Sequence, residues 1–207
     1  STSSQTYISP QGFQNHSIES ITLVSPDTPI LKYMGARLAN IKEGHFWLSN
    51  GQIATTVVSS FSQLHSLELD LAYRLDSFKL EMYKQLEQCA NLSQLTLRNG
   101  FTSSPEHVQS LLRMPALHTL HMNVGYAAID TLADLARLPH LRYLTLTFPG
   151  SPYRRFPTQF LTSFATPNIL GFEVSEEDCS QLNPIVDQIA HHFNPNCILR
   201  FFVHNVG

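Results

Sequence analysis

Apolar residues recur along the chain in a short pattern. One apolar residue is followed after two positions by a second, and after one more position by a third. The pattern is clearest in LHSLELDL, LSQLTLRN, LHTLHMNV and LRYLTLTF, which begin at Leu64, Leu92, Leu117 and Leu141. Because apolar and polar positions alternate within each segment, each is predicted to be a β-strand with one buried face.

Weaker copies of the pattern flank these four segments. They begin at Ile18, Ile41, Ile169 and Ile198, and in the copy that begins at Ile41 the second apolar position is Gly44. Successive copies start 23 to 29 residues apart. A period in this range indicates a protein built from repeated structural units.

Between the strands, apolar residues recur with helical spacing. Thr28 and Pro29 form one helix start signal, and Ser104 and Pro105 form another. The helices are expected over residues 28–38, 53–61, 77–89, 104–112, 129–136, 160–164 and 178–189. The chain therefore reads as an alternation of strands and helices.

A single strand–helix unit cannot bury its own apolar face, so the units must stack. Stacking produces a parallel sheet packed against a row of helices. Strands are spaced about 4.8 Å apart and helices about 10 Å apart, so the stack should curve with its strands on the concave face and its helices on the convex face. We expect an α/β solenoid of about seven or eight irregular repeats, forming one domain over residues 1–207. Residues 1–62 are degenerate repeats, 63–175 are clear repeats, and 176–207 form a C-terminal repeat or cap.

The four clear segments resemble the leucine-rich-repeat superfamily, in particular its helix-containing ribonuclease-inhibitor-like and F-box-associated classes. The family usually has Asn or Cys three residues after the last core residue. This chain departs from it there, with Ala72, Gly100, Gly125, Pro149, Glu177 and Val206.

The resemblance implies a non-catalytic protein–protein recognition domain that belongs to a larger chain or complex. Two settings fit: the substrate-binding part of an F-box type ubiquitin-ligase receptor, and a pathogen effector. The alternative is a regulator of an enzyme, such as a GTPase-activating protein.

Composition limits the kinds of partner that the chain is expected to bind and the cellular compartment in which it is expected to lie. The chain is 43% hydrophobic and 14% charged, which is typical of a folded core, and its net charge of −3 argues against nucleic-acid binding. No apolar run approaches the 18 or more residues of a membrane span. Cys89, Cys179 and Cys197 form no CxxC motif and favour reduced thiols, so we expect a cytoplasmic or nuclear protein.

The residues that most often carry chemistry do not form a recognisable motif. His118 and His121 are separated by an odd number of positions, so on a strand they point to opposite faces and cannot chelate together. Glu176, Glu177 and Asp178 lie where a helix should begin and are best interpreted as capping residues. We therefore expect no catalytic residue, no cofactor and no metal, and we do not expect an enzyme.

The concave face is the predicted binding surface, because its side chains alternate with the core. One column is predicted to contain Thr22, His45, Glu68, Thr96, His121, Thr145, Glu173 and Phe202. The next contains Val24, Trp47, Asp70, Arg98, Asn123, Thr147, Ser175 and His204. The candidates for partner binding are Trp47, Glu68, Asp70, Arg98, His121, Asn123, Tyr143 and Thr145. Two alternatives remain open: the face is an ordinary solvated surface, or Trp47 fills the core of an irregular N-terminal unit.

The loop that follows the strand near Leu146 is a second candidate. It contains Tyr153, Arg154 and Arg155 between two prolines and a phenylalanine. Loops at the carboxyl ends of parallel strands commonly bind ligands. This loop could anchor a partner or an anionic group, or it could be a solvated connection.

Overall fold

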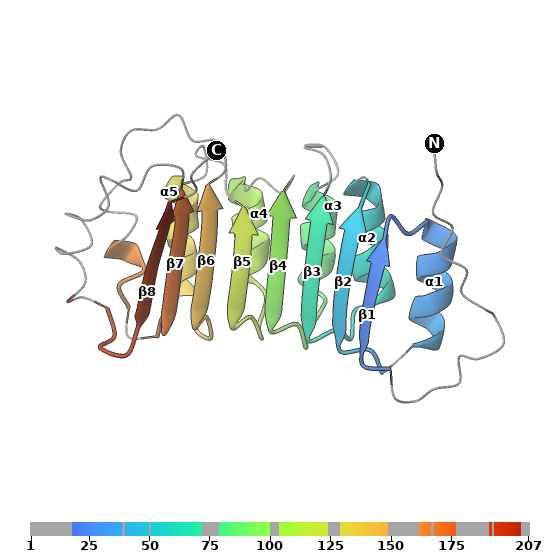
Figure 1. Cartoon of the computed structure of the whole chain (residues 1–207), viewed down its shortest axis with the longest axis horizontal. Coiled ribbons are helices and arrows are strands. Elements are labelled where there is room, and N and C mark those ends of the chain that lie inside the picture. The colour runs from blue at the N-terminus through green and yellow to red at the C-terminus, as the bar shows by residue number, and fades with distance from the viewer. Residues whose placement is uncertain are drawn as a thin grey trace.

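The computed structural model describes residues 18–38, 40–49, 51–71, 79–99, 104–123, 129–148, 162–166, 168–176, 191 and 193–203. Strands and helices alternate along these residues (Figure 1). The first half contains β1 (Ser20–Val24), α1 (Thr28–Arg37), β2 (Glu43–Leu48), α2 (Gly51–Ser60), β3 (Ser66–Leu71), α3 (Lys79–Leu86) and β4 (Gln94–Asn99). The second half contains α4 (Pro105–Leu112), β5 (Thr119–Asn123), α5 (Ile129–Leu132), the 3-10 helix η2 (Ala133–Arg137), β6 (Tyr143–Phe148), β7 (Gly171–Glu176) and β8 (Ile198–Val203).

The strands form one parallel sheet in chain order, from β1 to β8. Helices α2, α3, α4 and α5 lie on one side of this sheet, and α1 lies at the β1 end (Figure 1). The side opposite these helices is called the open face below. The α/β class with a parallel sheet is confirmed, and the arrangement is compatible with a repeat solenoid.

Strand register follows the repeated apolar pattern. Leu67 pairs with Leu95, which pairs with Leu120, and Leu120 pairs in turn with Leu144. These leucines are buried, as are those two positions further along β3, β4 and β6. The apolar face of each strand thus contributes to one continuous core shared with the helices.

At Gly44 a neighbouring ring replaces the missing core side chain. Gly44 pairs with Ile21 and Leu67, so it occupies a core position in the sheet. A Cβ atom on Gly44 would lie 2.5 Å from the Phe46 ring and 3.0 Å from the Leu64 side chain. Phe46 therefore fills the space that a larger residue would need, and its ring also packs against Phe61 at 5.4 Å.

The same backbone turn recurs at the start of successive strands. The carbonyl of Lys42 accepts hydrogen bonds from the amides of His65 and Ser66, at 2.8 and 3.0 Å. The carbonyl of Ser93 accepts from the amides of the next unit, His118 and Thr119, at the same two distances. Each strand thus enters the sheet with its first amides already satisfied by the preceding unit.

Two predicted helix starts are confirmed. The Asp27 carboxylate accepts a hydrogen bond from the Ile30 amide at 2.9 Å and caps α1. At α4 the backbone amide of Ser104 donates to His107 Nδ1 at 3.1 Å. The helix expected over 129–136 differs, because its second half is the 3-10 helix η2.

Several expectations fall on parts of the chain that the structure does not describe. These are the cap at residues 76–77, the start of the helix at residue 160, the helix over 178–189 and the six family turn positions.

The predicted register of the last strand is wrong by two residues. Ile198 pairs with Gly171, so Arg200 is the neighbour of Glu173, and Phe202 is the neighbour of Ser175. The predicted placements of Phe202 beside Glu173 and of His204 beside Ser175 are therefore incorrect. A shift of two residues preserves which face each residue occupies, which is why the apolar pattern alone did not reveal the error.

Candidate binding surface

The open face consists of three rows of residues that alternate with the core along each strand. The first row contains Ser20, Glu43, Ser66, Gln94, Thr119, Tyr143, Gly171 and Ile198. The second contains Thr22, His45, Glu68, Thr96, His121, Thr145, Glu173 and Arg200. The third contains Val24, Trp47, Asp70, Arg98, Asn123, Thr147, Ser175 and Phe202. The second and third rows follow the predicted columns up to β7.

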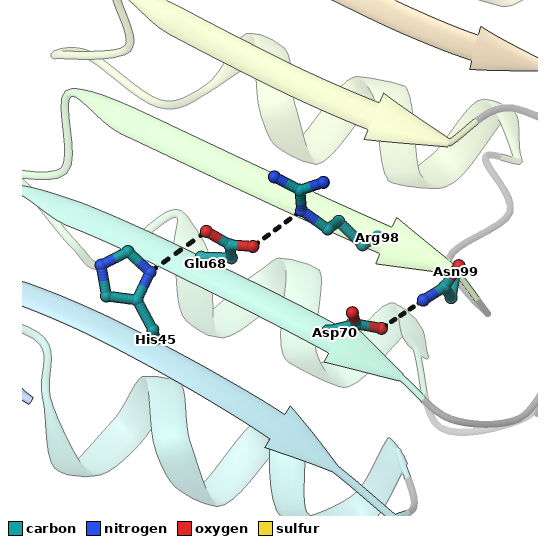
Figure 2. A network of polar contacts seen from close by, with 5 residues as sticks. All are labelled: His45, Glu68, Asp70, Arg98 and Asn99. Carbon is teal, nitrogen blue, oxygen red and sulfur yellow. Dashed lines mark hydrogen bonds and ion pairs between the residues drawn. The ribbon is translucent and has the colours of Figure 1, made fainter. Parts of the chain in front are cut away.

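A polar network joins three neighbouring strands at the β2–β4 end. The Glu68 carboxylate accepts a hydrogen bond from Arg98 Nε at 2.7 Å, and its other oxygen lies 3.1 Å from His45 Nδ1. Figure 2 shows the two terminal nitrogens of Arg98 on the side of the guanidinium away from Glu68. Glu68 thus holds Arg98 in place while the terminal donors of Arg98 remain on the surface.

A second pair lies at the carboxyl ends of β3 and β4. The Asn99 side-chain amide donates to the Asp70 carboxylate (Figure 2). Asn99 has a φ of 53°, in the left-handed region that Asn tolerates better than most residues. This conformation places Asn99 at the point where β4 leaves the sheet.

Trp47 lies on the open face, and 49% of its surface is exposed. It pairs with Val24 on one side and Asp70 on the other. Of the two interpretations of the sequence, the exposed position is therefore correct. Together with exposed Val24, Trp47 gives the β1–β2 end of the face an apolar character.

A hollow of about 260 Å³ lies across β5 to β8. Its polar and apolar lining includes Thr119, His121, Tyr143, Thr145, Gly171, Glu173, Ile198 and Arg200. A Cβ atom on Gly171 would lie 2.6 Å from Tyr143 Cδ1, so the Tyr143 ring rests in the space above the glycine. The absence of a side chain at Gly171 is what allows this ring position.

The His121 imidazole is half-buried at the edge of this hollow. Burial lowers its pKa below the ordinary value of histidine, and nearby Arg98 lowers it further. The Glu173 and Glu68 carboxylates act in the opposite direction. The neutral imidazole is therefore favoured at pH 7.

The predicted binding residues form two groups. Trp47, Glu68, Asp70 and Arg98 lie at the β2–β4 end, whereas His121, Tyr143 and Thr145 lie at the hollow, with Asn123 in the third row of β5. The predicted loop residues Tyr153, Arg154 and Arg155 lie outside the described residues.

The sequence reasoning missed the first row of the open face. Tyr143 was selected only for its residue type, and its neighbours Gly171 and Ile198 were not selected. This row could have been predicted by extending the alternation of apolar and polar positions by one polar position toward the start of each strand.

His118 and His121 do not form a joint site. The His118 ring lies before β5 and stacks on His140 with their centroids 5.8 Å apart, whereas His121 lies on the open face. Across the described ranges, no three His, Cys, Asp or Glu side chains gather as a metal site would require.

Two cysteines lie in the described part of the chain, and both are free thiols. Cys89 is buried, and burial raises the pKa of its thiol to about 11. Burial also raises the pKa of Cys197, which is only partly buried. Both groups are thus kept in the less nucleophilic protonated form at neutral pH.

Comparison of the chain with models of protein families finds no match, and comparison with curated proteins finds none. None of the helices described is both long enough and apolar enough to span a membrane.

Proposed function

We propose that this chain is a non-catalytic recognition domain of the leucine-rich-repeat type, which binds another protein through the open face of its sheet. The described residues form eight parallel strands in chain order, which supports the assignment to the helix-containing repeat class. The repeated turn and the shared core positions support it as well. In such a stack the open face is concave and can surround part of a partner.

The observation that carries this proposal is the exposure of Trp47 and Arg98 on the open face. Tryptophan and arginine are enriched among the residues that dominate binding energy at protein interfaces. Glu68 holds Arg98 at 2.7 Å, so little side-chain freedom remains to be lost on binding. Trp47 adds a large apolar surface that a partner would remove from water.

The polar groups at this end of the face suit binding better than catalysis. The Glu68 carboxylate is shared between Arg98 and His45, and Asp70 accepts from Asn99. These contacts order the donors that face outward. The same face would serve substrate recognition in an F-box type ubiquitin ligase or recognition of a host protein by a pathogen effector.

The test is capture of partners from the cells that express the chain, comparing variants of the two faces. Trp47→Ala and Arg98→Ala should each weaken capture by about tenfold or more, as expected for residues that dominate an interface. The matched controls are Tyr33→Ala and Arg37→Ala on α1. Tyr33 has the same 49% exposure as Trp47, and Arg37 stacks on its ring at 4.5 Å. The controls should capture the partner as the unchanged chain does.

Equal loss of capture in the α1 variants and the open-face variants would contradict the proposal, as would full capture by the Trp47→Ala/Arg98→Ala double variant. Co-purification of ubiquitin-ligase subunits would identify the receptor setting. If the chain stimulates GTP hydrolysis by a captured GTPase, and the open-face variants lose that stimulation, the function is regulation of an enzyme instead.

A further inference from the structure

The hollow across β5 to β8 has apolar walls and an acidic group. Tyr143 and Ile198 flank Gly171 in the register of the first row, and both side chains are about half exposed, at 46% and 54%. Because Gly171 has no side chain, the Tyr143 ring rests over its backbone and forms one wall of the hollow, with Ile198 on the other side of Gly171. Glu173 lies two positions further along the same strand and also lines the hollow.

The Glu173 carboxylate is the acidic group of the hollow, and it lacks an ion-pair partner among the described residues. It is half-buried, and it forms no salt bridge or side-chain hydrogen bond with another described residue. By contrast, Glu68, which lies in the same row of the open face on β3, is neutralised by Arg98. Among the described residues Glu173 has no such cationic partner, so a cation placed beside it could form a charge-assisted hydrogen bond.

The charge of the whole open face also favours a basic partner. Among the described side chains of this face, the acids are Glu43, Glu68, Asp70 and Glu173, and the permanent cations are Arg98 and Arg200. Since the pKa of His121 is lowered by burial, its imidazole adds little positive charge at pH 7. The face is therefore net acidic and would attract a basic segment.

We propose that the hollow binds a basic side chain of the partner protein, an arginine or a lysine, with its cationic head at Glu173. The aliphatic stem would lie in the hollow against the Tyr143 ring and Ile198, and the head would pass the ring before it reaches the carboxylate. Long basic side chains commonly bury their stems against apolar surface while their heads pair with acids. This inference rests on the proposed recognition function and specifies the chemistry of the partner.

Arg200 is the main group that opposes this binding. It is exposed, and the register places it beside Glu173 on β8, yet the structure shows no salt bridge between these two residues. Its charge would repel an incoming cation. Arg200→Gln should therefore strengthen binding of a basic probe, whereas a merely structural role for Glu173 predicts no such effect.

The experiment is a titration of the complete, isotopically labelled chain with N-acetyl-arginine methylamide, followed by NMR. The neutral analogue N-acetyl-citrulline methylamide has nearly the same shape and serves as the control probe. The arginine probe should shift the amide signals of Tyr143, Gly171 and Glu173, and the citrulline probe should shift them far less. Glu173→Gln should weaken binding of the arginine probe by about tenfold or more, since a charge-assisted contact is lost.

Glu43→Gln is the matched control variant, because Glu43 is an exposed acid of the same face on β2 and does not line the hollow. It should bind the arginine probe as the unchanged chain does. A second variant, Gly171→Ala, tests the shape of the hollow. Its new Cβ atom would force the exposed Tyr143 ring to move, so the probe should bind less well while the chain remains folded.

Three results would overturn the proposal. Equal binding of the citrulline probe would show that charge is not recognised. If N-acetyl-glutamate methylamide, used in place of the arginine probe, shifts the signals of the hollow, then the hollow binds anions through Arg200. The absence of any shift at the hollow up to the solubility of the arginine probe would show that no basic side chain binds there. None of these results affects partner capture through Trp47 and Arg98, so failure of this inference is distinguishable from failure of the proposed function.

Discussion

The Leu120 side chain shows how single residues hold the sheet to the helices. Leu120 lies on β5 between Leu95 and Leu144, and its side chain is fully buried. Leucines at the same position of neighbouring strands share one core, so each is surrounded by side chains that cannot easily collapse into a gap.

Leu120→Ala should therefore destabilise the protein by about 2–5 kcal/mol, the cost of lost apolar contact plus a cavity. Urea unfolding followed by circular dichroism measures the change. Gln94→Ala, at an exposed position of the neighbouring strand, should change stability by less than about 0.5 kcal/mol. A similarly small value for Leu120→Ala would mean that the Leu120 side chain does not support the core.

The His121 imidazole should make stability depend on pH. Burial, aided by Arg98, lowers its pKa in the folded state, against the opposing effect of Glu173 and Glu68. The unfolded chain, with a histidine pKa of about 6.5, then takes up a proton before the folded chain does. The contribution of His121 to the free energy of unfolding is therefore complete above about pH 6.5. It is lost as the pH falls toward and through the lower pKa of the folded state.

Urea unfolding at pH 7.5 and 5.5 tests this direction. The unchanged chain should lose more stability on acidification than His121→Gln, which cannot take up the proton. If the two proteins lose the same amount, the folded-state pKa of His121 is not lowered. Arg200 also lines the hollow and is charged at both pH values, so it does not contribute to the difference.

At the scale of elements, close packing of neighbouring helices depends on one glycine in α1. A Cβ atom on Gly35 would lie 2.5 Å from the backbone oxygen of Ser60 and 2.9 Å from its Cβ atom. Ser60 is the last residue of α2. The backbone of Ser60 cannot move aside as a flexible side chain would, so the two helices can approach this closely only because residue 35 is glycine.

Gly35→Ala should lower stability by about 1–3 kcal/mol, because the overlap outweighs the gain in helix propensity of up to about 1 kcal/mol. Thermal unfolding would measure the change, with Lys32→Ala on an exposed position of the same helix as the control. An increase in stability for Gly35→Ala would show that α1 and α2 pack less closely here.

At the scale of the molecule, the core is one cluster that extends from Ile21 on β1 to Phe193 before β8. Neighbouring strands contact along the whole sheet, and neighbouring helices contact from α1 to η2. Aromatic rings extend the core toward the C-terminal end through Phe164, Phe172 and Phe193. Units that share a core in this way tend to unfold together, since each interface is lost when its neighbour unfolds.

Unfolding should therefore occur in a single transition. Trp47 is the only tryptophan in the sequence and reports from β2, near the N-terminal end. Circular dichroism reports from all the helices and strands. The two signals should give the same urea midpoint. An earlier midpoint for tryptophan fluorescence would show that the N-terminal units unfold separately from the rest.

Local features of the sequence were enough to predict most of the elements. The alternation around Leu67, Leu95, Leu120 and Leu144 identified the strands and their neighbours, because a buried face forces apolar residues to recur every second position. Helix starts near Pro29 and Pro105 were predictable because capping acts within a few residues.

The last strand shows the limit of the same reasoning. Ile198, Phe201 and Val203 fit the apolar pattern, but so do Leu199 and Phe201, and only pairing with β7 decides between the two registers. At Gly44 the pattern alone indicated a poor strand, and only packing shows that Phe46 fills the vacant position.

The sequence by itself thus determined the order of strands and helices and the face that each strand buries, because both follow from periods within a few residues. The binding surface was only partly predictable. Trp47 could have been core or surface, and the contact of Arg98 with Glu68 joins residues 30 positions apart in the chain. Only the tertiary structure places Tyr143 over Gly171 and puts Arg200 beside Glu173, because these relations depend on which strands become neighbours and in which register.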